Sequence, residues 1–150
     1  MASIPPRLKR ILDMVDTVAN REEREMLLIG YAERFRPVPT EIAFPPYPEE
    51  KRIPYCESDA YVWVIQNADA TLTPYFAVEN PSGISAKALA SILSDGLRGA
   101  SPEDVATVTE EIVERIFRQN LSMGKGMGLT AMVRRLAAEA KAINNARALR

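Results

Sequence analysis

The chain has 150 residues, of which 47% are hydrophobic and 26% charged, and its formal net charge is −1. This composition is typical of a globular protein, and the balanced charge indicates no nucleic-acid or membrane surface. One cysteine and no histidine exclude an intramolecular disulfide, a Cys–His pair and a Ser–His–Asp triad. We expect one domain over residues 1–150, without a structural metal site. We also expect a cytoplasmic protein, because residues 1–16 lack a signal-peptide pattern and no apolar run reaches about 20 residues.

The first third of the chain is predicted to form two helices. Apolar residues at helical spacing follow the prolines at the start of a helix over residues 6–18. A second helix is expected to begin at Asn20, whose spacing from Glu23 is that of a capping box. From Arg36 to Pro54, six prolines exclude a helix and predict an extended surface segment.

A β-hairpin is predicted after this segment. Residues 61–66 are rich in β-branched and aromatic side chains, as expected of a strand, and residues 67–70 suit a turn. The return strand is expected over residues 71–78. Pro74 predicts that this strand lies at a sheet edge or carries a bulge, because proline cannot donate a ladder hydrogen bond.

The rest of the chain is predicted to be helical. Ser85 is expected to cap one helix that ends near Gly96 or Gly99, and Ser101 followed by proline and two acids begins another. That second stretch is expected to break at Thr109. Helices segregated from antiparallel strands indicate an α+β fold with a hairpin packed against five to six helices.

Residues 121–128 (LSMGKGMG) are predicted to form a glycine-rich loop before a final helix that starts at about Leu129. This loop does not match a phosphate-binding motif. A P-loop would require glycine where Gln119 stands, and serine or threonine where Gly126 stands. We therefore interpret it as a helix–helix connection whose Lys125 supports a neighbouring site.

Cys56 is the candidate site residue. It lies between the proline-rich segment and the first strand, followed by Glu57, Ser58 and Asp59, so a loop is expected. Free cysteines are usually buried and inert, but a core cysteine normally lies on an apolar stripe and this one does not. No histidine is present to activate it, and the neighbouring acids disfavour a thiolate. These residues leave two readings open, a thiol that receives a group from a partner and an inert thiol.

Three stretches in order resemble the SufE family of sulfur-acceptor proteins. The first is Cys56-Glu57-Ser58 leading into the strand with Val62-Trp63. The second is Ser101-Pro102-Glu103-Asp104-Val105. The third runs from Asn120-Leu121-Ser122 through Gly128-Leu129-Thr130-Ala131-Met132-Val133. Their order and approximate spacing cover most of the chain.

The resemblance implies a single SufE-like domain with a fold like that of IscU-type scaffold proteins. It also implies a persulfide on Cys56, taken from a PLP-dependent, SufS-like cysteine desulfurase that the carrier stimulates, and passed toward iron–sulfur scaffold proteins. The chain itself would need no cofactor, because PLP belongs to the partner. Neither nucleic acid nor membrane is an expected partner, and both a monomer and a homodimer are compatible with the sequence. Glu57, Ser58, Lys125 and Asn120 are the expected supporting residues.

The chain departs from the family pattern at four positions in or next to these stretches, and at one of them Met123 replaces a proline. Tyr55 replaces a glycine, Asn120 a histidine and Lys125 an arginine, and lysine keeps the charge without the bidentate fork. Two other functions stay open: an adaptor of the same fold that carries no sulfur, and a stand-alone cysteine enzyme. The adaptor predicts partner binding that is insensitive to substitution of Cys56. The enzyme, which the absence of histidine disfavours, requires turnover without a partner.

Overall fold

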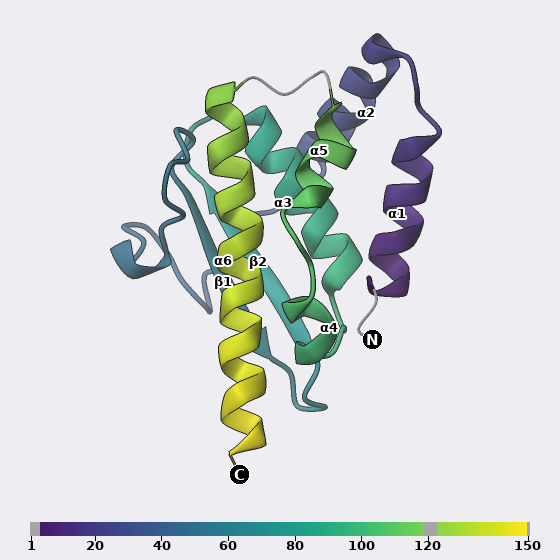
Figure 1. Ribbon diagram of the computed structural model, residues 1–150. Helices are drawn as coiled ribbons and strands as arrows, with labels where there is room; N and C mark the ends of the chain where they lie inside the picture. Colours follow the sequence, from purple (N-terminus) through teal and green to yellow (C-terminus); the bar gives the residue numbers. More distant parts are fainter. Residues whose placement is uncertain (1–3, 119–122, 150) are drawn as a thin grey trace.

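The computed structural model describes residues 4–118 and 123–149, and confirms the predicted α+β fold (Figure 1). Its elements in chain order are α1 (Pro6–Asp16), α2 (Arg21–Glu33), the 3-10 turn η1 (Glu49–Lys51), β1 (Ala60–Gln66), β2 (Leu72–Val78), α3 (Ile84–Leu97), α4 (Pro102–Ala106), α5 (Glu111–Phe117) and α6 (Met123–Ala148).

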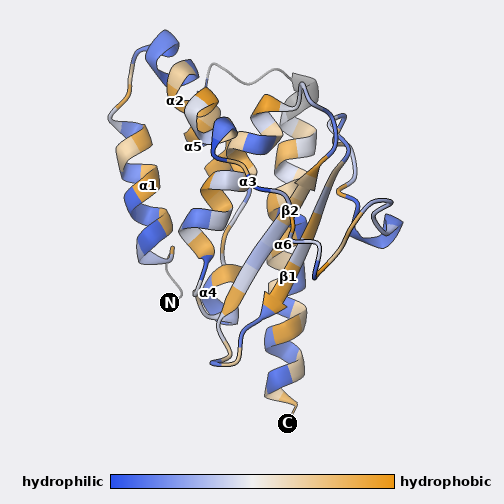
Figure 2. Cartoon of the chain, turned by 180° about the vertical axis from the view of Figure 1, so that it is seen from behind, coloured by the Kyte–Doolittle hydropathy of each residue, from blue (hydrophilic) through white to orange (hydrophobic). Residues whose placement is uncertain are grey.

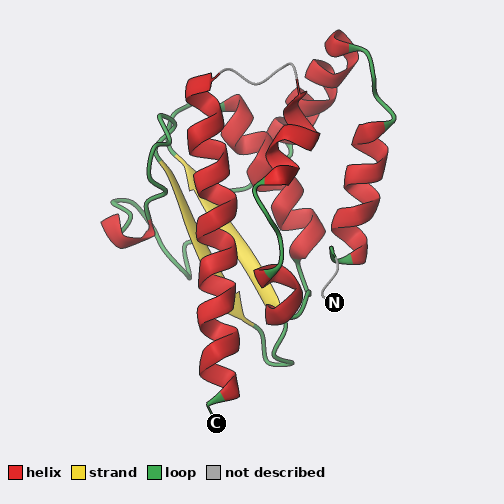
Figure 3. Ribbon diagram, viewed as in Figure 1, coloured by secondary structure: helices red, strands yellow, loops and turns green. Residues whose placement is uncertain are grey.

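The predicted hairpin is confirmed, with β1 and β2 antiparallel and Ala60 opposite Val78. Alternate side chains of the two strands point to opposite faces of this sheet. One face packs against the helices, with α6 crossing in front of the strands in Figure 3. Val62, Val64, Leu72 and Phe76 join the helices in the main core on this face.

The other face of the sheet is covered by the proline-rich segment, and Figure 2 looks onto this side. Tyr61 and Trp63 lie here with Val38 in a second, smaller cluster. The ring of Tyr47 is 5.1 Å from that of Tyr61 and 5.4 Å, edge-on, from that of Trp63. The segment contains no α-helix, as predicted, but besides η1 it turns at residues 39–43, where Ile42 and Ala43 donate to the carbonyl oxygen of Pro39. Its apolar residues cover the sheet in place of a helix.

Several predicted helix boundaries are confirmed. The side chain of Asn20 accepts hydrogen bonds from the backbone of Glu22 and Glu23 at 2.9 and 3.1 Å. Ser101 accepts from the backbone of Asp104 at 3.1 Å, and α4 and α5 are separate helices on either side of Thr109. In both caps a side-chain oxygen satisfies backbone N–H groups that the first turn of the helix leaves free.

Two predictions about helix starts are wrong. Ser85 does not cap α3, because the N-cap is Gly83 and no side chain caps this end. The glycine-rich residues 123–128, predicted as a loop, belong to the first turns of α6. Glycine disfavours a helix interior by roughly 1 kcal/mol relative to alanine, so the sequence favoured a loop. Close packing of Gly128 against another segment, described below, offsets this preference.

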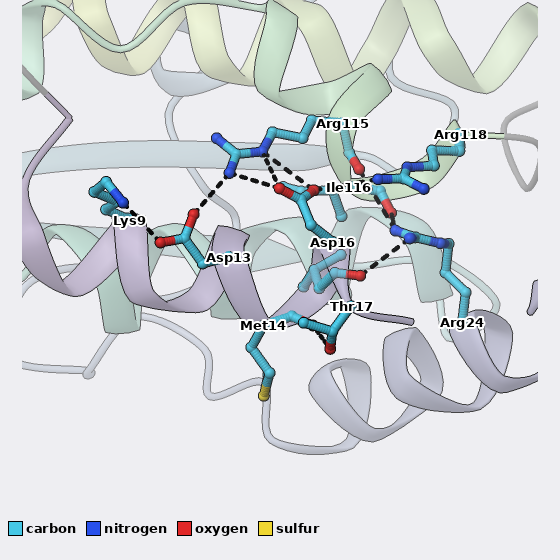
Figure 4. Close-up of polar contacts among 10 residues, drawn as sticks. Lys9, Asp13, Met14, Asp16, Thr17, Arg24, Arg115, Ile116 and Arg118 are labelled. Atoms are coloured by element: carbon cyan, nitrogen blue, oxygen red, sulfur yellow. Dashed lines mark hydrogen bonds and ion pairs between the residues drawn. The ribbon is translucent and has the colours of Figure 1, made fainter. Parts of the chain in front are cut away.

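Arg24 of α2 is 2% exposed and joins the ends of two other helices (Figure 4). Its guanidinium donates to the carbonyl oxygens of Val15 and Val18, at the end of α1, at 3.0 and 2.6 Å. It also donates to the carbonyl oxygen of Ile116 in α5 at 2.9 Å. The negative end of each helix dipole therefore faces a buried positive charge.

Candidate functional site

Cys56 lies in a short loop that the start of the sheet holds at both ends. The backbone N–H of Ile53 donates to the carbonyl oxygen of Ala60 at 2.8 Å, which closes the loop over residues 54–59. Asn80 and Glu79 donate to the carbonyl oxygens of Ser58 and Asp59, both at 3.1 Å. The predicted loop is thus confirmed, and its ends are tied to both strands of the hairpin.

Two residues of this loop adopt left-handed backbone conformations. Tyr55 has φ 60° and Asp59 has φ 51°, values that cost a non-glycine residue roughly 1 kcal/mol. A short bond of 2.5 Å from Arg52 holds the carboxylate of Asp59. The glycine expected at position 55 from the family pattern has a physical reason, since glycine adopts this conformation without strain. In this chain the tyrosine adopts it instead.

The thiol of Cys56 is buried, with 9% of the residue exposed, and belongs to the main core cluster. Glycines of two helix starts pack against its loop. A Cβ atom at Gly128 would lie 2.9 Å from Cys56 Cα and 2.9 Å from the carbonyl oxygen of Tyr55. A Cβ atom at Gly83 would lie 2.8 Å from Ser58 Oγ. Only glycine allows α6 and the start of α3 to approach the loop this closely.

A cavity of about 250 Å³ lies beside Cys56. The loop forms one wall, the first turn of α3 another, and Gly128 and Leu129 of α6 complete it. No side chain caps the N-terminus of α3, and its first turn lines this cavity, so the positive end of the helix dipole lies next to it. A negative charge next to Cys56 would be favoured by this helix end.

Large apolar side chains near this cavity are exposed. Tyr55 is 71% exposed and also lines the cavity, as does Ile84 at the start of α3. Met127, next to Gly128, is exposed as well. Exposed apolar groups next to a cavity are typical of a surface that a partner protein covers.

The structure brings two of the four predicted supporting residues to the cavity. Glu57 and Ser58 line it, with Glu57 exposed and Ser58 half-buried. Asn120 and the side chain of Lys125 lie outside the described residues, so their roles stay predictions. Sequence reasoning missed the wall formed by α3, because the start of this helix lies 28 residues beyond Cys56. The only sequence signal for this contact between α3 and the Cys56 loop is Gly83, and a glycine there is equally expected at the end of the hairpin.

Within the part of the chain whose side chains are described, no three Cys, Asp or Glu side chains gather closely enough to hold a metal ion. No helix of the described residues is long and apolar enough to cross a bilayer. The cavity beside Cys56 thus places a thiol at a helix N-terminus, together with the carboxylate of Glu57 and the hydroxyl of Ser58.

Replacing Gly128 by alanine should displace the Cys56 loop. The new methyl group meets backbone atoms at 2.9 Å, which cannot rotate away as a side chain can. We expect the free energy of unfolding to fall by about 1–2 kcal/mol and the thiol to react faster with iodoacetamide, because the loop moves outward. Thermal denaturation and alkylation rates measure both effects.

Gly30→Ala is the matched control, because no atom lies within 4 Å of a Cβ at this helical glycine. It should stabilise the protein by roughly 0.5–1 kcal/mol through helix propensity and leave the alkylation rate unchanged. Equal stabilisation by both substitutions would contradict the close packing of Gly128 against the loop.

A family model described as "SufE: Fe-S metabolism associated domain" matches residues 9–140. Among solved structures, the chain is similar to a hypothetical protein from Thermus thermophilus whose structure was determined in solution. The two are 28% identical with a TM-score of 0.73, over 95% of this chain and 99% of that one. Among the curated proteins, no sequence matches this chain.

Proposed function

This chain belongs to the SufE family, which is associated with Fe–S metabolism, and from that premise we propose that it is a sulfur-acceptor protein. Cys56 receives a sulfur atom from a cysteine desulfurase that uses PLP, stimulates that enzyme by removing the sulfur, and passes it toward iron–sulfur cluster assembly. The reducing cytoplasm suits a protein whose function depends on one free thiol.

The observation that carries this proposal is the position of Cys56 in a tied loop beside a cavity of about 250 Å³. The cavity is large enough for the additional sulfur atom of a persulfide. The N-terminus of α3 favours the negative charge of an ionised persulfide, because its free backbone N–H groups and its dipole are positive at this end. The site thus stabilises an ionised persulfide on Cys56, so that the sulfur stays on the protein and is not released into solvent.

The transfer is an exchange reaction like that between thiols and disulfides. The thiolate of Cys56 attacks the terminal sulfur of a persulfide on the desulfurase. A new S–S bond forms on Cys56, the S–S bond of the donor breaks, and the donor cysteine leaves as a thiolate. The proton of Cys56 passes to solvent or to the departing thiolate, so no oxidant, reductant or metal is consumed.

The desulfurase must cover the cavity for this reaction to occur. The exposed apolar side chains of Tyr55, Ile84 and Met127 are suited to that contact, since burying them in an interface removes apolar surface from water. The alternative function, an adaptor that binds a partner without carrying sulfur, would use the same surface. The two proposals differ in whether Cys56 is required.

The test is a desulfurase assay with L-cysteine, in which alanine release is measured with and without this protein. We expect the purified protein to raise the rate of a SufS-type desulfurase several-fold. Ile84→Asp should reduce this stimulation, because it places a charge in the apolar contact. Ile29→Asp is the control, because Ile29 is an exposed apolar residue of α2 that does not line the cavity. No increase in alanine release with the wild-type protein would contradict the proposal.

A further inference from the structure

A second and larger cavity, of about 670 Å³, lies along the edge of β2 that does not pair with β1. It is bounded by the end of α2, by residues 35–39, by β2 and by one side of α3. It shares no residue with the cavity beside Cys56. We call it the β2 groove.

The outer edge of β2 is paired at two points and open between them. Phe76 accepts a hydrogen bond from the backbone of Val38 at 2.8 Å. Leu72 donates to the carbonyl oxygen of Ala100 and accepts from the N–H of Gly99, both at 2.8 Å. The two pairings are four residues apart, which is about 13 Å of strand.

Backbone polar groups face the groove in this interval. Successive residues of a strand direct their backbone groups to alternate edges, so Pro74 shares the outer edge with Leu72 and Phe76. The carbonyl oxygen of Pro74 and the N–H of Phe76 therefore point outward, and neither has a hydrogen-bond partner among the described residues. An extended peptide can donate to the first and accept from the second.

The opposite wall of the groove is a polar stripe of α3. Ser91, Ser94 and Asp95 occupy positions i, i+3 and i+4 of the helix, the spacing at which a core-facing helix normally carries apolar residues, and Arg98 follows as its C-cap. Ser91 is 5% exposed, and its hydroxyl has no hydrogen-bond partner among the described residues. A polar wall of this kind is suited to a polar occupant.

The charges around the groove favour an anionic occupant. Arg34 and Arg98 share one carboxylate, that of Asp95, at 2.8 and 3.7 Å. Arg36 makes no ion pair with any described residue. With Glu33 as the other acid, three arginines face two carboxylates on a chain whose net charge is −1.

We propose that the β2 groove binds a short, extended, acidic segment of a partner protein as an additional strand. The backbone of the segment pairs with Pro74 and Phe76, and its carboxylate side chain binds the arginines, Arg36 first. Backbone pairing of this kind supplies affinity, and side-chain contacts supply specificity. A free small anion would leave the groups of the strand edge unpaired.

The test is a titration of the ¹⁵N-labelled protein, followed by NMR, with the acetylated and amidated peptide Thr-Val-Glu-Val-Thr. We expect the amide signals of Tyr75, Phe76 and Ser91 to shift. The same peptide with glutamine at its centre should bind about tenfold more weakly, because the charge-assisted contact is lost. An N-methylated peptide that cannot donate to Pro74 should bind more weakly as well.

Arg36→Gln should reduce affinity for the glutamate peptide to that of the glutamine peptide. Arg10→Gln is the matched control, because Arg10 is exposed on α1, outside the groove, and it should leave affinity unchanged. Equal affinity for both peptides, or the same shifts with sodium acetate alone, would overturn the proposal. Its failure would leave the role of Cys56 untouched, because the desulfurase assay does not involve this groove.

Discussion

Replacing Cys56 by serine should abolish sulfur acceptance and return desulfurase turnover to its rate without the carrier. A serine hydroxyl has nearly the shape of the thiol but is not ionised at neutral pH, and it forms no persulfide. The partner's sulfur then has no acceptor on this chain. Alanine release by the desulfurase, measured over time with wild-type and variant protein, gives the comparison.

A serine at position 56 could also disturb the packing around it. Cys56 is 9% exposed, so burying a hydroxyl there carries some cost, and Cys56→Ala serves as an apolar second variant. Both variants should still bind the desulfurase, because Tyr55, Ile84 and Met127 are unchanged. Stimulation that persists in both variants would favour the adaptor and contradict the carrier.

Replacing Arg24 by methionine should lower the free energy of unfolding by about 3–5 kcal/mol, the largest effect on stability that we expect. Methionine fills much of the same volume but leaves the carbonyl oxygens of Val18 and Ile116 without their donor, whereas that of Val15 keeps the N–H of Val18 at 3.1 Å. Each buried carbonyl left unpaired costs roughly 1–3 kcal/mol. Urea denaturation followed by circular dichroism measures the difference.

Arg21→Met is the matched control, because Arg21 begins the same helix and is exposed. It should change the free energy of unfolding by less than about 0.5 kcal/mol. Equal effects of the two substitutions would show that the buried contacts of Arg24 contribute nothing particular. An ion pair between Asp16 and Arg115 also joins α1 to α5. Hydrogen bonds from Arg115 hold the pKa of the Asp16 carboxyl below its usual value.

Local signals predicted much of the fold. Asn20 and Ser101 mark helix starts because their side chains satisfy backbone donors within three residues. The hairpin follows from β-branched residues on both sides of a turn, and the strand that carries Pro74 is an edge strand of the two-stranded sheet, as predicted. In each case the stabilising partner is close in sequence, so the pattern is visible without the structure.

Other features depend on partners far along the chain. Gly128 is helical although glycine disfavours helices, because it packs against Cys56, 72 positions earlier. Arg24 occupies the same helix face as Leu28 and Tyr31, where an apolar residue is expected, and its charge is satisfied by α1 and α5. An arginine at a core-facing position was the sequence signal for this contact. This signal did not reveal which carbonyl groups Arg24 binds.

In the candidate site, too, local features could be predicted from the sequence and contacts between distant segments could not. The sequence identified Cys56 and predicted its loop, since it is the sole cysteine and precedes a strand. It did not reveal that the thiol is buried, nor that the start of α3 forms a wall of its cavity. The burial of the thiol and the wall formed by α3 both depend on packing between the helices and the loop. A local sequence pattern does not predict such packing.

The central claim is that Cys56 carries sulfur, and mass spectrometry tests it most directly. The protein is incubated with a cysteine desulfurase and L-cysteine, then alkylated and digested without reductant. We predict a gain of about 32 Da, one sulfur atom, on the peptide that contains Cys56, and its release by dithiothreitol. A Cys56 peptide of unchanged mass, under conditions in which the desulfurase itself carries a persulfide, would contradict the account.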